Sequence, residues 1–166
     1  MPLMRRAALL LLPGSALAGC GLFGGDEPPP PPPPPPPPTI VSLTLKAAPD
    51  VNAEADGTGR PVQVRVLKLA SVGDFMEADF FALDGDLAGT LGKALLGEEK
   101  LTLGPNQVQV WQREFGEEAR FIGVMGAYRN IGAASWRAFA EVPRHQTTLL
   151  DAKLGPDGVR LAPSGL

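Results

Sequence analysis

The segment IVSLTLK at residues 40–46 alternates apolar and polar side chains. A two-residue period is typical of a β-strand that buries one face. The segment VQVRVLK at residues 62–68 repeats this period. The two segments therefore predict a pair of strands, each with an apolar face directed toward a common core. The apolar positions are Val41, Leu43, Leu45, Val62, Val64 and Val66.

Several more strand patterns follow along the chain, separated by turn residues. Residues 101–103 and 108–110 flank Gly104-Pro105-Asn106, which predicts a hairpin. Gly155-Pro156-Asp157-Gly158 is a second turn signal, because proline and glycine favour the backbone angles of tight turns. About eight short strands within residues 39–166 predict one mainly β domain, an antiparallel β-sandwich. The remaining strand segments are residues 121–128, 136–142, 147–154 and 158–161.

Residues 71–96 interrupt the strand pattern. They hold few β-branched residues and many Ala and Leu, which predicts one or two short helices inserted between strands. Ser71 is a candidate N-cap for the first of them. Their large apolar side chains are expected to cover one end of the sandwich, and these are Phe75, Phe80, Phe81 and Leu83.

Residues 1–19 have the pattern of a secretory signal peptide. Arg5 and Arg6 precede an apolar run at residues 7–12, and small residues come before Cys20. The apolar run is too short to cross the ~30 Å hydrocarbon layer as a helix, so it is not expected to anchor the protein by itself.

The tetrapeptide Leu17-Ala18-Gly19-Cys20 resembles the lipobox of bacterial lipoproteins. The resemblance implies a diacylglyceryl group on the Cys20 sulfur, cleavage before Cys20 and acylation of its amino group. A buried or unpaired cysteine is the alternative, but the glycines around Cys20 could not form a core. Each buried acyl methylene contributes ~0.8 kcal/mol, so two or more chains give stable attachment. Gly21 in place of Asp points to the outer membrane, by resemblance to sorting in Gram-negative bacteria.

Eleven consecutive prolines at residues 28–38 complete the segment 20–38 between the cysteine and the domain. Proline lacks a backbone N–H and has a fixed φ, so this run predicts an extended polyproline helix. At ~3.1 Å per residue it would span about 34 Å as a semi-rigid spacer. A motif for a proline-binding domain is the alternative reading.

The charge and the cysteine content exclude several classes of function. The net charge is −3, and removal of residues 1–19 takes away two positive charges, giving −3 − 2 = −5. An acidic domain argues against nucleic-acid binding and against polybasic attachment to lipid head groups. With one cysteine no intramolecular disulfide can form.

The sequence gives little support for a catalytic site or a metal site. His145 is the only histidine, and a serine triad would need it beside, for example, Ser135 and Asp151. No serine has the nucleophile-elbow motif around it, and one histidine cannot build an imidazole or thiolate zinc cluster. The chain is therefore expected to be no enzyme and to hold no cofactor or metal.

A calcium loop and a glycan site are two further alternatives. Residues 50–57 place oxygen ligands at alternate positions, but the glycine and the distal glutamate are not at EF-hand positions, so a solvated acidic loop is preferred. Trp111 and Trp136 could stack on sugars in a periplasm-facing ligand- or glycan-binding lipoprotein, although tryptophans buried in the core are preferred. The calcium-type positions are Asp50, Asn52, Glu54, Asp56 and Gly57.

Four segments in order resemble one family over residues 40–142. They are VSLTLKA at 41–47, RPVQVRVLKL at 60–69, FMEADFFAL at 75–83 and RFIGVMGAYRN at 120–130, followed by Trp136-Arg137. With the lipobox leader they resemble TssJ, the outer-membrane lipoprotein family of type VI secretion.

This resemblance implies a transthyretin-like β-sandwich that is a structural part of a multi-copy, trans-envelope complex. It also implies an outer-membrane protein that faces the periplasm and binds the periplasmic C-terminal region of TssM, an inner-membrane protein. The family's contact element is the loop between the first two strands, here about residues 48–60, expected to be exposed and turn-rich. A mere connector is the alternative. The expected contact residues are Pro49, Asp50, Val51, Asn52, Asp56, Gly57, Gly59 and Arg60.

Overall fold

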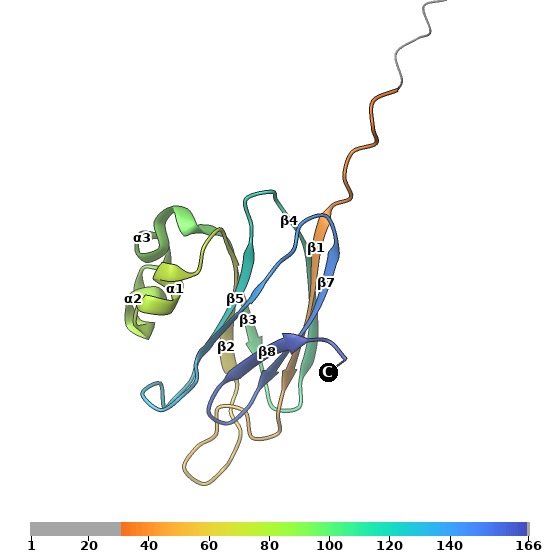
Figure 1. The fold of residues 1–166 in the computed structure, drawn as a ribbon. Helices are drawn as coiled ribbons and strands as arrows, with labels where there is room; N and C mark the ends of the chain where they lie inside the picture. The colour runs from red at the N-terminus through yellow and green to blue at the C-terminus, as the bar shows by residue number, and fades with distance from the viewer. Residues whose placement is uncertain (1–30, 166) are drawn as a thin grey trace, which may run out of the picture. The chain divides into compact units, whose positions relative to one another are not determined.

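The computed structural model describes residues 31–165, and the predicted leader and Cys20 lie outside them. Eight strands form two four-stranded sheets, sheet A in the order β4-β1-β7-β8 and sheet B in the order β3-β2-β5-β6 (Figure 1). The mainly β fold is thus confirmed. The strands are β1 Thr39–Ala47, β2 Val62–Leu69, β3 Leu95–Leu103, β4 Val108–Phe115, β5 Phe121–Ala127, β6 Arg137–Glu141, β7 Thr147–Leu154 and β8 Val159–Pro163.

Residues 31–34 carry no helix or strand and are exposed. Among the described residues, no helix combines the length and apolar character needed to cross a membrane.

One strand pair departs from the predicted antiparallel arrangement. β1 and β7 run parallel, with Ile40 opposite Thr147 and Leu45 opposite Ala152, whereas every other named pair is antiparallel. β7 follows β6 of the other sheet, so the chain crosses between sheets and enters beside β1 in the same direction. Parallel neighbours need such a crossover rather than a hairpin.

The main core lies between the two sheets. The predicted apolar faces of β1 and β2 are confirmed, because Val41, Leu43 and Val64 are fully buried there. Trp111 belongs to the same cluster and is 3% exposed, which agrees with the expectation that it is buried in the core. Fully burying an aliphatic side chain such as that of Leu43 stabilises the fold by roughly 1.5–3 kcal/mol.

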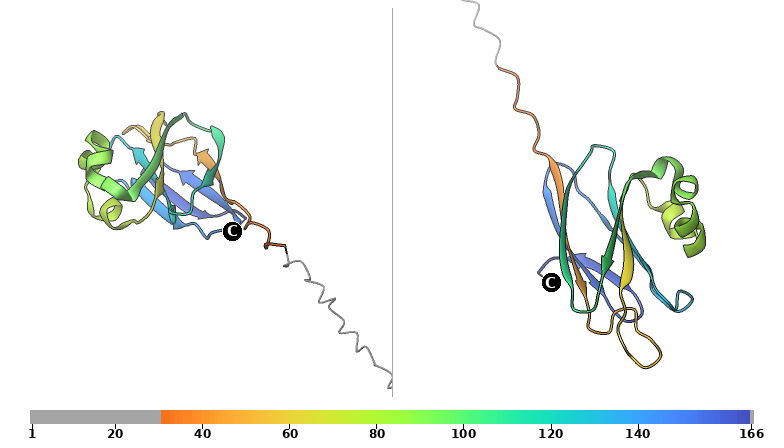
Figure 2. Two further views of the ribbon diagram at one scale, coloured as in Figure 1. Left: turned by 90° about the horizontal axis from the view of Figure 1, so that it is seen from above. Right: turned by 180° about the vertical axis from the view of Figure 1, so that it is seen from behind.

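A helical layer covers the outer face of sheet B (Figures 1 and 2). It consists of α1 Gly73–Glu77, α2 Phe80–Gly85, α3 Leu87–Leu91 and a 3₁₀ turn, η1 Gly92–Ala94. The insertion therefore holds three short helices rather than one or two, and it ends where β3 begins at Leu95. Its buried side chains pack on β2 and β5 and form a second core of Leu67, Leu69, Phe75, Leu83, Leu87, Leu91 and Met125.

Two details of the helical prediction were wrong. Ser71 is not the N-cap, since Val72 holds that place without a side-chain bond, whereas Asp79 and Asp86 cap α2 and α3. The insertion covers a sheet face rather than one end of the sandwich, and Phe81 is 71% exposed instead of contributing to that cover.

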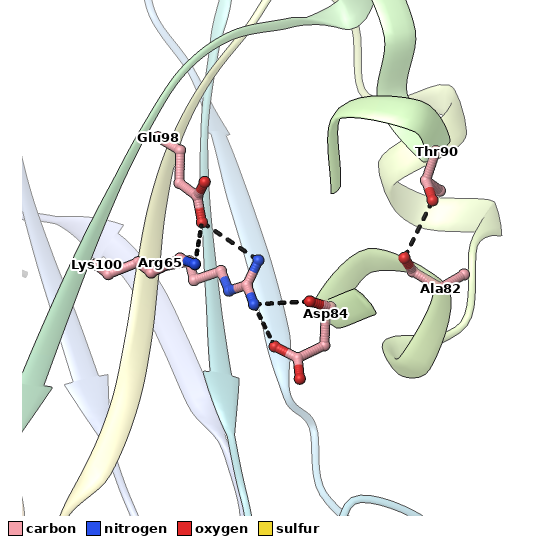
Figure 3. Close-up of polar contacts among 6 residues, drawn as sticks. All are labelled: Arg65, Ala82, Asp84, Thr90, Glu98 and Lys100. Carbon is pink, nitrogen blue, oxygen red and sulfur yellow. Dashed lines mark hydrogen bonds and ion pairs between the residues drawn. The ribbon is translucent and has the colours of Figure 1, made fainter. Parts of the chain in front are cut away.

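Arg65 ties this layer to sheet B. Its guanidinium is buried, lies 3.2 Å from the Glu98 carboxylate, pairs with the Asp84 carboxylate and donates to the Asp84 carbonyl at 2.9 Å (Figure 3). Arg137 acts beside it by donating to the carbonyls of residues 75, 76 and 78, which end α1 without helical partners. Two arginines from the sheet thus hold the short helices in place.

Replacing Arg65 with Ala should lower the free energy of unfolding by about 2 kcal/mol, because it leaves the Asp84 carboxylate without a cation and Glu98 with Lys100 alone. Arg65→Met keeps most of the side-chain volume but removes the same cation, so its loss should be only slightly smaller. Urea unfolding of both variants measures this. A loss below about 1 kcal/mol for Arg65→Ala would mean that the ion cluster does not hold the layer.

Candidate partner-binding loop

Residues 48–61 connect β1 of sheet A with β2 of sheet B at the end of the sandwich away from Thr39. Figures 1 and 2 show this loop projecting beyond the ends of the strands. The backbone N–H of Ala48 donates to the Leu154 carbonyl at 2.9 Å, and that of Asn52 donates to the Gly155 carbonyl at 3.2 Å. The loop therefore starts from a position fixed against the end of β7.

Val51 and Asn52 form the base of the loop and are buried, with 0% and 5% exposure, although the sequence predicted exposed contact residues. Asn52 has φ +50°, so the chain bends there and turns its side chain inward. The side-chain amide donates to the Pro61 carbonyl at 2.9 Å and accepts from the Arg129 backbone N–H at 2.8 Å. The expected exposure of Val51 and Asn52 is therefore wrong, and both residues anchor the loop to the domain.

The tip of the loop, residues 55–58, is exposed. Below it, the Glu54 N–H donates to the Thr58 carbonyl at 2.9 Å, and the Gly57 N–H donates to the Glu54 carbonyl at 2.9 Å. Gly57 has φ +84°, which favours glycine. A Cβ on Gly59 would lie 2.2 Å from the Pro49 carbonyl oxygen, so only glycine fits where the two arms meet. The tip is exposed but held in one turn.

Three charged side chains of the loop, Glu54, Asp56 and Arg60, are held by hydrogen bonds or ion pairs. Glu54 lies 2.9 Å from Arg60 and 3.4 Å from Arg129. The hydrogen bond from Arg60 holds the pKa of Glu54 below its usual value, and the Thr58 backbone N–H does the same for the pKa of Asp56. Within residues 31–165 no cluster of acidic, histidine or cysteine side chains could hold a metal ion.

A comparison with models of known protein families identifies the family of this chain. Residues 39–157 match the family model described as Type VI secretion lipoprotein, VasD, EvfM, TssJ, VC_A0113. The chain belongs to this family. The assignment to the TssJ family from sequence motifs is thereby confirmed.

Solved structures agree with the TssJ assignment. TssJ1 from Pseudomonas aeruginosa is 33% identical to this chain and superposes with a TM-score of 0.75. The match covers 78% of this chain and 99% of the TssJ1 chain. Serratia marcescens Lip, a membrane-bound component of the type VI secretion system, is 31% identical over 76% of this chain and 98% of its own, with a TM-score of 0.70. No curated protein matched the chain.

A more distant match comes from a structure described as the T6SS protein TssM C-terminal domain (869-1107) from EAEC. It is 19% identical over 75% of this chain and 98% of the matched chain, with a TM-score of 0.61. At this identity the match shows the TssJ-like fold alone.

The loop of this TssJ family member depends on Asn52. Asn52→Ala should lower the free energy of unfolding by about 2 kcal/mol, since the Pro61 carbonyl and the Arg129 N–H lose their part-buried hydrogen bonds and alanine is strained at positive φ. Asn52→Gly relieves the strain and should cost about 1 kcal/mol less. Chemical denaturation of both variants tests this, and a loss below about 0.5 kcal/mol for Asn52→Ala would show that the base is not anchored by this side chain.

The loop should loosen in acid. The folded pKa values of Glu54 and Asp56 are lowered, so the two ionised carboxylates stabilise the loop fully above the ordinary carboxylate range. This stabilisation of the loop is lost as pH falls through the lowered pKa values. The Thr58 amide resonance should therefore titrate with a midpoint below about 3.9, the unperturbed value for Asp. NMR titration measures the midpoint, and Asp56→Asn should abolish the transition. A midpoint at or above the unperturbed value would contradict the assignment.

The structure does not bring the residues of the weighed triad together. The His145 N–H donates to the Thr39 hydroxyl at 2.8 Å, at the start of β1. Ser135 forms a bridge to Gly158 near the opposite end of the sandwich. The Asp151 carboxylate accepts a hydrogen bond from Lys46 at 2.7 Å.

The two tryptophans are engaged with other side chains of the domain. Trp111 is buried between the sheets, and Trp136 packs edge-on against Phe80 at 5.3 Å between ring centroids. The Arg137 guanidinium lies over Trp136 at 4.4 Å from the ring centroid. No observation therefore favours the glycan-binding alternative.

Arg129 lies outside the loop but contacts it, and sequence reasoning missed this residue. It follows β5 and contributes both a backbone N–H to Asn52 and a guanidinium to Glu54. Its distance of 77 residues from Asn52 leaves no spacing signal between them. It lies within the TssJ-like segment 120–130, which is the one feature that could have pointed to it.

Proposed function

We propose that this chain is an outer-membrane lipoprotein, anchored through lipid on Cys20 and facing the periplasm. In this role it is a structural, non-enzymatic component of the type VI secretion membrane complex. Its loop, residues 48–60, binds the periplasmic C-terminal region of a TssM-like inner-membrane protein. Membership of the type VI secretion lipoprotein family supports the anchor and the complex.

The observation that carries the loop assignment is the contrast between its base and its tip. The base is buried and bonded to three other segments, whereas residues 55–58 are exposed. A loop that is already ordered loses little conformational entropy when it binds, so more of the contact energy appears as affinity. A mere connector between β1 and β2 would not need this internal hydrogen bonding.

The choice of partner rests on the TssJ resemblance. A structure whose description names TssM contains a chain of this fold, which is compatible with the same partner. The test is a pull-down in which the mature chain, starting at Cys20→Ser, is offered the purified periplasmic C-terminal fragment of the TssM-like protein from the same genome. We expect stoichiometric capture at micromolar concentrations. Failure to capture the fragment at those concentrations would overturn the proposed partner.

A further inference from the structure

Three cations form a row across the outer face of sheet A. Lys46 of β1 lies opposite Lys153 of β7, and Lys153 lies opposite Arg160 of β8. Residues directly opposite on neighbouring strands point to the same face of a sheet. Like charges in such register repel, so the row opposes the stability of the sheet unless an anion offsets it.

Within residues 31–165 the Asp151 carboxylate pairs directly with one end of this row and lies near enough to attract Lys153 without pairing with it. Lys46 is paired with Asp151 at 2.7 Å. Lys153 and Arg160 are exposed, and neither forms an ion pair with any residue in 31–165. They stand out on a chain whose net charge is −3.

The row borders an open groove of about 550 Å³. All three cations line it, and Asp157 is the one carboxylate among the lining residues. This volume lies within the range of about 300–1,000 Å³ that is typical of binding clefts. The other walls are small or apolar and leave room for an extended chain, and they include Ala48, Leu154, Gly155 and Gly158.

The groove is continuous with the base of the loop. Ala48 lines the groove and bonds to Leu154, and Asn52 bonds to Gly155, which also lines it. A partner that contacts the tip at residues 55–58 would therefore meet the groove at the same end of the sandwich. At the other end of the row, Val108 of β4 lies opposite Lys46 and is 61% exposed, which adds an apolar contact.

We propose that this groove binds an extended, carboxylate-bearing segment of the partner protein that docks on the loop. This inference rests on the proposed function and adds a second contact area with its own chemistry. The Arg160 guanidinium can bind a carboxylate through two hydrogen bonds, and Lys153 supplies a point charge beside it. The two cations also steer an acidic segment toward the groove, so binding weakens as salt rises.

The experiment compares two double charge reversals in the mature chain. Lys153→Glu with Arg160→Glu removes the cations of the groove. Lys93→Glu with Arg144→Glu is the matched control, because both residues are exposed and the change in net charge is the same. The probe is the purified periplasmic fragment of the TssM-like protein, and its Kd is measured at about 50 mM and about 300 mM NaCl.

The groove variant should bind at least about 10-fold more weakly at low salt and show a smaller salt dependence, while the control stays within about threefold of the wild type. A tip variant with Gly-Ser-Gly-Ser at residues 55–58 is measured alongside. If the groove variant binds the fragment like the wild type and the tip variant does not bind it, the groove inference is overturned and the loop assignment is kept. If the tip variant binds normally and the groove variant fails, the loop assignment is overturned and the groove stands. Unchanged partner affinity together with lost binding to phosphatidylglycerol vesicles would assign the cations to a membrane surface and overturn the inference.

Discussion

Replacing residues 55–58 with Gly-Ser-Gly-Ser is expected to weaken binding of the TssM-like periplasmic fragment by about 100-fold, or about 2.7 kcal/mol. The replaced residues are the exposed tip of the loop, where truncation removes contacts without opening the core. The replacement also removes the Asp56 carboxylate that accepts from the Thr58 N–H, so ordering the tip costs part of the binding energy. Titration calorimetry with the purified fragment measures the change.

The same variant should keep its fold. The thermal midpoint should stay within about 3 °C of the wild type, because no buried side chain is altered. A control replaces Glu117 and Glu118, which are exposed in the β4–β5 loop, with Gly-Ser. This control should bind the fragment as the wild type does. Equal affinities for the tip variant and the control would remove the partner contact from the loop.

Deletion of residues 50–59 is a less informative experiment. It would remove Val51 from the main core and Asn52 from its bonds to Pro61 and Arg129. Loss of binding could then result from unfolding, since a buried aliphatic side chain is removed and two backbone groups lose their hydrogen-bond partner. The tip replacement separates the contact surface from the anchors.

Cys20→Ser is expected to abolish membrane attachment of the mature protein. Attachment by two or three acyl chains is stable because every buried methylene contributes ~0.8 kcal/mol, and serine oxygen cannot receive the thioether-linked lipid. The variant should be soluble or remain as an uncleaved precursor in the inner membrane. Membrane fractionation and labelling with radioactive palmitate measure this.

Gly21→Asp is the matched control for Cys20→Ser. It keeps the cysteine that is proposed to carry lipid but introduces the residue that, by the lipobox resemblance, retains lipoproteins in the inner membrane. The Gly21→Asp variant should therefore still incorporate palmitate but fractionate with the inner membrane instead of the outer membrane. Outer-membrane fractionation of Cys20→Ser would contradict the lipid anchor, and unchanged sorting of Gly21→Asp would contradict the reading of Gly21.

The strands could be predicted from the sequence because their signals are local. Alternation in residues 40–46 and 62–68 follows directly from the pleat of a half-buried strand. The parallel pairing of β1 with β7 could not be predicted in this way, because Ile40 and Thr147 meet across more than half of the chain. The helical insertion was recognised by composition, but its true caps are aspartates, Asp79 and Asp86, rather than Ser71.

The structure has an exposed loop between the first two strands, as predicted, but the inner organisation of that loop differs from the prediction. Pro49, Asp50, Gly57, Gly59 and Arg60 carry the expected turn chemistry. Val51 and Asn52 were misplaced, because turn-forming residues can face either solvent or core. The direction depends on a positive φ and on partners from the β5–β6 segment, which only the three-dimensional structure reveals.

The most direct test of the central claim is photocrosslinking in living cells with benzoylphenylalanine in place of Ala55. Ala55 is exposed at the tip and makes no side-chain hydrogen bond, so the substitution leaves the loop intact. The loop assignment predicts a crosslink to the TssM-like protein from position 55 and none from position 117 in the β4–β5 loop. A crosslink from position 117 with none from position 55 would contradict it.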